Sequence, residues 1–121
     1  MDAAVLQNLQ STHLAIWKEN DPVKRIGLMT RVYSAGIRMF DPGFTLTGHQ
    51  EVSDFISKLH AGGNLVNFTA TAPLEATQHG ARLFWAIESK NSGEIMTGMD
   101  FFIVENDLVT QLFVFIDAPK V

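Results

Sequence analysis

Two aspartates with apolar neighbours are the residues of this sequence best suited to acid–base chemistry. Asp41 stands directly before a proline, and Asp100 shares one face of a predicted strand with Phe102 and Val104. A carboxyl group that loses water to apolar neighbours has a raised pKa, so it can hold or exchange a proton near neutral pH. Each aspartate also has a structural alternative. Asp41 could cap N–H groups in a turn, and Asp100 could pair with Arg82 on the next strand.

His13 is the third candidate, because it lies on the apolar side of a predicted helix, one turn from Leu9 and from Trp17. A lone histidine in such a place can equally be a hydrogen-bonded core residue. The other histidines, His49, His60 and His79, lack ligand spacing, and the chain has no cysteine. We therefore expect no metal site and no cofactor. No serine–histidine–aspartate order, phosphate loop or nucleotide fingerprint occurs either.

Length and composition bound the class of protein. A chain of 121 residues predicts a single domain, residues 1–121, with a core of its own. Apolar residues make up 46% and charged residues 18%, which excludes disorder. A net charge of −4 without a basic cluster argues against a nucleic-acid partner. No apolar run is long enough for a membrane span, and the first residues do not resemble a signal peptide, so we expect a cytoplasmic protein.

Helical spacing predominates before residue 62. Apolar residues at three- and four-residue intervals predict a helix over 3–18, and Asp21 followed by proline predicts the start of a second helix, with Arg25 on its outer side. A short strand is expected over 37–40. Thr47 and Gln50 match a capping box that opens a third amphipathic helix, which ends near residue 62.

Strand alternation follows residue 63. We expect a strand over 65–78 that is irregular at Pro73, then strands over 81–88, 96–104 and 108–116 joined by short turns, which make them antiparallel. The last two strands are apolar on both faces. One face can cover a core or pocket, and the other needs a partner, so we expect a homodimer.

Aromatic side chains are expected to line the pocket. The sequence has nine Phe and two Trp, which supply large apolar area. The expected lining residues are Trp17, Tyr33, Phe55, Trp85, and Phe113 or Phe115, because the pattern leaves open which face of the last strand points inward. A pocket of this kind suits a small apolar molecule.

The order of these elements, with Phe40-Asp41-Pro42, Thr97-Gly98-Met99-Asp100 and the closing segment 113–117, resembles the nuclear transport factor 2-like superfamily. Within it, the chain is most similar to SnoaL-like and ketosteroid-isomerase-like proteins. This resemblance implies an α+β fold, a cystatin-like cone in which N-terminal helices pack on a strongly curved, mostly antiparallel sheet that encloses a pocket.

The resemblance also implies roles for the candidate residues. In steroid isomerases an aspartate before proline moves a proton beside a carbonyl, while a second, protonated aspartate and a tyrosine donate hydrogen bonds to the oxyanion. Asp41 matches the first aspartate and Asp100 the second. The tyrosine position falls near His13, whereas Tyr33 is predicted in the second helix.

Polyketide cyclases and limonene-type epoxide hydrolases are also similar in outline, but they use an aspartate inside the last strand. Residues 112–115 contain no acid. Three functions remain open: an isomerase-type enzyme that transfers a proton on a small apolar carbonyl compound, a non-catalytic binder of a small apolar ligand, and a dimerisation module with a vestigial pocket.

Overall fold

Three helices occupy the first half of the chain. The computed structural model describes residues 1–63 and 65–117, and its helices are α1 (Ala3–Lys18), α2 (Pro22–Val32) and α3 (Gly48–Ala61). The carboxylates of Asp2 and Asp21 accept hydrogen bonds from the backbone N–H groups of Val5 and Val23, each at 2.9 Å, and so cap α1 and α2. The predicted span of α1 and start of α2 are confirmed. No helix in the described residues is long and apolar enough to cross a membrane.

Thr47 is the N-cap residue of α3 as predicted, but neither hydrogen bond of the predicted capping box forms. The hydroxyl of Thr47 makes no cap bond, and the Thr47 N–H donates to the carboxylate of Glu51 at 2.9 Å. Gln50, which was expected in that role, donates to Asp54 instead. Gly48 enters the helix with a φ of +83°, a left-handed conformation. The regular capping-box spacing is therefore not kept, and the acceptor comes one residue later.

Within residues 1–63 and 65–117, seven strands form one curved sheet. They are β1 (Tyr33–Phe40), β2 (Thr45–Thr47), β3 (Leu65–Ala70), β4 (Glu75–Thr77), β5 (Gly80–Ser89), β6 (Ile95–Glu105) and β7 (Leu108–Ile116). Their order is β2-β1-β7-β6-β5-β3, with β4 also paired to β5. β1 and β7 run parallel, and the other described pairs are antiparallel.

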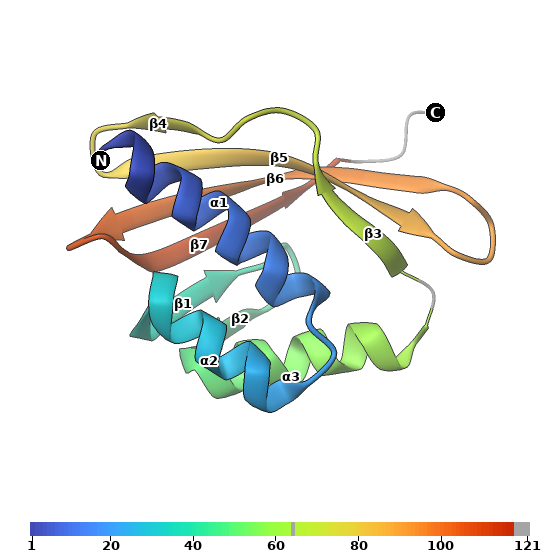
Figure 1. The fold of residues 1–121 in the computed structure, drawn as a ribbon. Coiled ribbons are helices and arrows are strands. Elements are labelled where there is room, and N and C mark those ends of the chain that lie inside the picture. Colours follow the sequence, from blue (N-terminus) through green and yellow to red (C-terminus); the bar gives the residue numbers. More distant parts are fainter. Residues whose placement is uncertain (64, 118–121) are drawn as a thin grey trace.

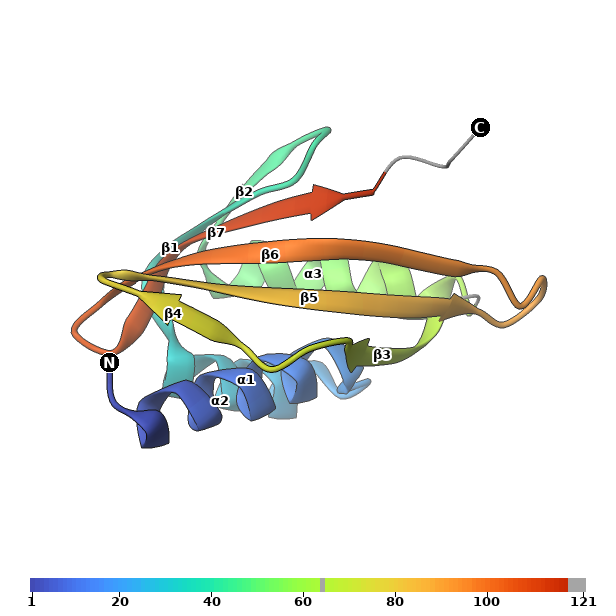
Figure 2. The ribbon, with the colours of Figure 1, turned by 90° about the horizontal axis from the view of Figure 1, so that it is seen from above.

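The helices and the sheet enclose a space between them. Figures 1 and 2 show α1 and α2 along one face of the curved sheet, and α3 packs on β1 and β2 and against α2. The expected α+β architecture, helices on a curved and mostly antiparallel sheet, is confirmed.

The strand expected over 65–78 is two strands, because the segment around Pro73 is irregular. A proline has no N–H for a ladder, so the pairing with β5 stops at Ala70 and resumes at Glu75. The turns between β5 and β6 and between β6 and β7 agree with the prediction of short connections. Asn106 and Asp107 both have positive φ, 52° and 63°, as a two-residue hairpin turn requires.

Arg25 is buried and does not lie on the outer side of α2, so that prediction is wrong. Its guanidinium is fully buried and donates to the backbone oxygens of Glu19 and Ser53, both at 2.7 Å, and to the hydroxyl of Ser57 at 2.8 Å. A buried cation is tolerated when its N–H groups are satisfied. Arg25 therefore joins the loop after α1 to α3.

Candidate active site

An apolar cavity of about 110 Å³ lies between α1, α3 and the concave face of the sheet. Its walls include Trp17 from α1, Phe55 and Leu59 from α3, Phe68 from β3, and Trp85 from β5. A cavity of roughly 150 Å³ can hold benzene. The volume therefore suits a ligand of similar size. Two carboxyl groups also line the cavity, those of Asp41 and Asp100.

Asp100 lies in the middle of β6 with both carboxyl oxygens engaged. It is 3% exposed; its Oδ1 accepts from the indole N–H of Trp85 at 2.9 Å, and its Oδ2 lies 2.9 Å from Nε2 of His13. The alternative partner, Arg82, pairs with Glu75 at 3.3 Å on the exposed face. The pairing of Asp100 with Arg82 is therefore wrong, because neighbouring positions of β5 point to opposite faces and the one opposite Asp100 is Leu83.

His13 connects Asp100 to Tyr33. Nδ1 of His13 lies 2.5 Å from the Tyr33 hydroxyl, which also accepts from the indole N–H of Trp17 at 3.3 Å. An indole N–H can only donate, so the tyrosine O–H is free to donate to Nδ1. Nε2 then carries the histidine proton and donates it to Asp100. This arrangement leaves no group of the network without a partner. Burial raises the pKa of Tyr33, which fits a hydroxyl that keeps its proton.

Asp41 lies at the end of β1, where the strand meets the cavity. It is partly buried; its Oδ2 accepts from the backbone N–H of Gly43 at 3.2 Å, and its own N–H donates to Phe44 at 2.9 Å. The turn-capping role and the place in the cavity wall are therefore both present. Oδ1 of Asp41 has no hydrogen-bond partner within the described parts of the chain, so one oxygen is available to a ligand.

Three of the expected aromatic residues line the cavity, namely Trp17, Phe55 and Trp85. Tyr33 and His13 do not. Both are buried one layer further in, behind Asp100, because Tyr33 is the first residue of β1 and not part of the second helix. Hydrogen bonds connect them to the cavity wall, His13 through Asp100 and Tyr33 through Trp17.

Phe113 and Phe115 do not line the cavity, so this part of the predicted lining is wrong. The register pairs Asp100 with Val114, so Val114 shares the concave face, while Phe113 and Phe115 pair with Phe101 and Met99 on the outer face. Phe115 is 54% exposed.

Seven further residues line the cavity that the sequence pattern did not indicate. They are Met39, Leu59, Phe68, Ile87, Met96, Val114 and Ile116. Val114 and Ile116 could have been found by assigning Asp100 to the cavity and counting across the hairpin of β6 and β7. The other five carry no signal that separates cavity wall from ordinary core.

Possible metal ligands are not clustered in the part of the chain that the structure describes. In residues 1–63 and 65–117 no three histidine, cysteine, aspartate or glutamate side chains gather as metal ligands. The groups at this site that can exchange protons are its two carboxyl groups and the network behind Asp100.

Solved structures share this fold. An isomerase candidate of the SnoaL-like family from Agrobacterium tumefaciens is 19% identical and superposes with a TM-score of 0.83, covering 95% of this chain and 99% of its own. A protein of unknown function with a cystatin-like fold from Methylobium petroleophilum is 15% identical, with a TM-score of 0.78, over 100% and 81% of the two chains. A SnoaL-like polyketide cyclase candidate from Jannaschia is 13% identical, with a TM-score of 0.71, over 97% and 90%.

No protein-family model and no curated protein matches the sequence. At identities this low, structural likeness establishes the fold and leaves the activity open. The chain has the fold of the SnoaL-like and ketosteroid-isomerase-like proteins of the nuclear transport factor 2-like superfamily.

Proposed function

We propose that this chain binds a small apolar carbonyl compound in the cavity and transfers a proton beside the carbonyl group. The observation that supports this most is that Asp41 and Asp100 line one apolar cavity. Proton transfer between carbon atoms needs a carboxylate that accepts a proton and a donor that stabilises the oxyanion. A structural likeness to an isomerase candidate agrees with this chemistry.

In the proposed reaction, Asp41 is the base. Its free Oδ1 takes a proton from the carbon next to the carbonyl, and the electron pair of that C–H bond moves onto the carbonyl oxygen. Asp100, in its protonated form, donates a hydrogen bond to that oxygen. Asp41 then returns the proton to carbon, so no other reactant is consumed. No cofactor is required by these steps.

His13 and Tyr33 are positioning residues in this proposal. The N–H groups of His13 and Trp85 each occupy one lone pair of Asp100 and so fix the plane of its carboxyl group. A proton on Asp100 then has to point along a remaining lone pair. The same two hydrogen bonds give each oxygen of Asp100 a partner within the protein, and this observation supports the second candidate, a non-catalytic binder of a small apolar ligand.

The distinguishing experiment measures exchange of deuterium from D₂O into the carbon next to the carbonyl of cyclohexanone, by NMR. The wild-type protein should accelerate exchange, and Asp41→Asn should lose about 10²–10⁴-fold of that acceleration, because the base is removed. Asp54→Asn is the matched control, since Asp54 is exposed on α3 and does not line the cavity. Equal acceleration by wild type and Asp41→Asn would exclude Asp41 as the base, and no acceleration by the wild type would leave the binder.

We also propose a cytoplasmic location. The support is compositional: a chain without cysteine has no disulfide that needs an oxidising compartment.

A further inference from the structure

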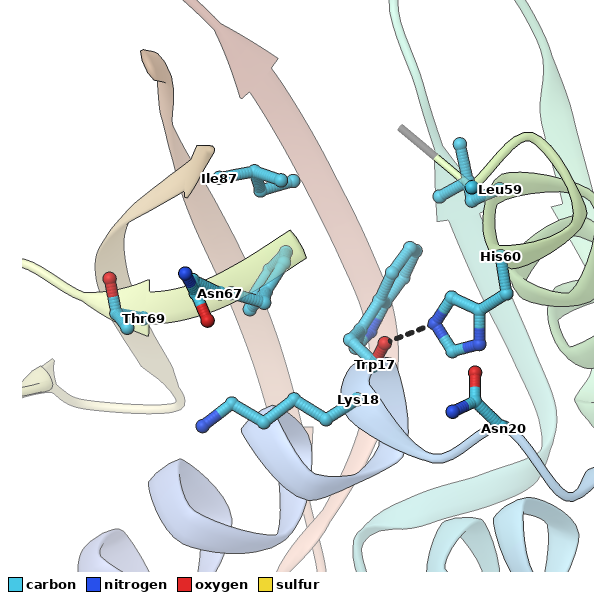
Figure 3. Close-up of a pocket in the computed structure, with 10 residues that line it drawn as sticks. Trp17, Lys18, Asn20, Leu59, His60, Asn67, Thr69 and Ile87 are labelled. Carbon is cyan, nitrogen blue, oxygen red and sulfur yellow. Dashed lines mark hydrogen bonds between the residues drawn. The ribbon is translucent and has the colours of Figure 1, made fainter. Parts of the chain in front are cut away.

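A second, larger hollow adjoins the cavity. It measures about 440 Å³ and lies between the end of α1, the end of α3 and β3. Its rim is polar, unlike the inner cavity, and carries Lys18, Asn20, His60, Asn67 and Thr69 (Figure 3).

A bulge in β3 builds one wall of this hollow. Asn67, Phe68 and Thr69 are consecutive, yet all three line it. A regular strand would turn alternate residues to opposite faces. Asn67 has a φ of 56°, and the pairing with β5 shifts between Val66 and Thr69. Bulges of this kind redirect side chains and occur often beside functional sites.

The hollow and the cavity share a wall. Trp17, Leu59, Phe68 and Ile87 line both spaces. A ligand that occupies both spaces has to pass between these four side chains. Its apolar part would then lie in the inner cavity and its polar end at the outer rim.

The charge at the rim indicates which polar group of a ligand the outer hollow can bind. The ammonium group of Lys18 has no carboxylate within 4 Å in the described part of the chain, and its side chain extends toward the strand that carries Asn67 and Thr69 (Figure 3). The carboxylate of Glu88 is nearby but is held by the amide of Asn67 at 2.7 Å. The side chains of Asn20 and Thr69 make no hydrogen bond with described residues. One cation with two neutral polar side chains beside it supplies the single charge that a carboxylate needs, whereas a phosphate carries more charge than one lysine balances.

We propose that the outer hollow binds the carboxylate of an elongated ligand, with Lys18 as its counter-ion, while the apolar carbonyl end of the ligand occupies the inner cavity. This inference rests on the proposed function and narrows its substrate class to small oxo acids.

The test uses 7-oxooctanoate and its uncharged methyl ester, with dissociation constants measured by calorimetry. Wild-type protein should bind the acid about fivefold more tightly than the ester, the size expected for a partly exposed ion pair. Lys18→Gln should abolish that preference and leave the ester affinity unchanged. Lys24→Gln, which removes an exposed lysine of α2 outside the hollow, should keep it.

The outcomes separate the two proposals. If both probes bind and their affinity ratio is the same in wild type and Lys18→Gln, the carboxylate subsite is wrong and the cavity proposal stands. If neither probe binds, both are wrong. If the preference for the acid over the ester depends on Lys18 but the protein does not accelerate deuterium exchange into cyclohexanone, the carboxylate subsite is supported and the proposed catalysis is not.

Discussion

Asp100, His13 and Tyr33 form a buried hydrogen-bond network in which each shared proton can be assigned to one atom. The tyrosine donates to Nδ1 of His13, and Nε2 donates to Asp100, so the tautomer of His13 should be the one with its proton on Nε2. Nitrogen-15 NMR of the imidazole ring would show this tautomer directly. In Tyr33→Phe the donor to Nδ1 is lost, and the ring should become free to take the other tautomer. A wild-type ring with its proton on Nδ1 and none on Nε2 would contradict the hydrogen-bond assignment.

Tyr33 should also make stability fall in alkaline solution. Burial raises its pKa in the folded state above the ordinary value of about 10. From about pH 10 upward the unfolded chain loses this proton while the folded protein keeps it. Deprotonation then favours unfolding, by at most about 1.4 kcal/mol for each pH unit. Stability from this source is present below about pH 10 and is lost as pH rises.

The measurement is urea unfolding at pH 9 and at pH 11. The wild type should lose more stability between these values than Tyr33→Phe, which has no phenol to titrate. Equal losses in the two proteins would show that Tyr33 does not govern the alkaline response.

At the scale of the elements, the Trp85 side chain of β5 and the backbone of β7 lie so close to Gly98 of β6 that only glycine fits there. Gly98 lies opposite Trp85, and a Cβ at this position would come within 2.3 Å of both the Trp85 ring and the backbone oxygen of Phe115. Gly98→Ala should therefore displace Trp85, which both lines the cavity and holds Asp100. Overpacking of this kind costs about 1–3 kcal/mol.

Chemical unfolding and ligand affinity would both be measured for Gly98→Ala. Gly36→Ala is the matched control, because Gly36 also lies in a strand but a Cβ added there would meet no neighbouring side chain or strand within 4 Å. The control should change stability little. A Gly98→Ala protein with unchanged stability and affinity would mean that the sheet relaxes freely at this point.

The helices were predictable from the sequence because their starting signals are local, whereas the inward face of β7 depends on pairing with another strand. The caps at Asp2 and Asp21 are local, so the start of each helix is determined by a few neighbouring residues. The segment 112–116 is apolar at every position, so alternation carries no information about its inward face. That choice is made by pairing Asp100 with Val114 across the hairpin.

The candidate site was predictable in part. The two aspartates were recognisable through the motifs that flank them, and the structure places both at one cavity. The links from Asp100 to His13 and Trp85 join residues 87 and 15 positions apart, and no local pattern shows them. Arg25 is similar, since its acceptors lie mostly on the backbone of other segments.

For the whole molecule, the outer face of the sheet supports the prediction of a homodimer. Phe40, Phe113 and Phe101 form a row across β1, β7 and β6, with ring centroids 4.7 and 6.3 Å apart, and Phe84 and Phe115 are 37% and 54% exposed on the same face. An apolar surface of this kind is typical of interfaces. A second copy is the simplest partner for it.

Sedimentation at micromolar concentration should show a dimer for the wild type. Phe115→Lys should give a monomer, because it places a charge in the apolar outer face of the sheet, whereas Val23→Lys, at an exposed position of α2, should leave the dimer intact. A monomeric wild type would show that this face has no self-association at that concentration.

The central place of β7 in the sheet has a consequence for the order in which the protein is made. β7 follows every other described strand in the chain, yet it lies between β1 and β6 and pairs with both. Until residues 108–116 are available to pair, the earlier strands can pair only in two separate groups, β2 with β1 and β3 to β6 together. Each group exposes an open edge beside apolar residues, the arrangement most prone to aggregate. The cavity, whose walls come from both groups, forms only when the final strand is inserted between them.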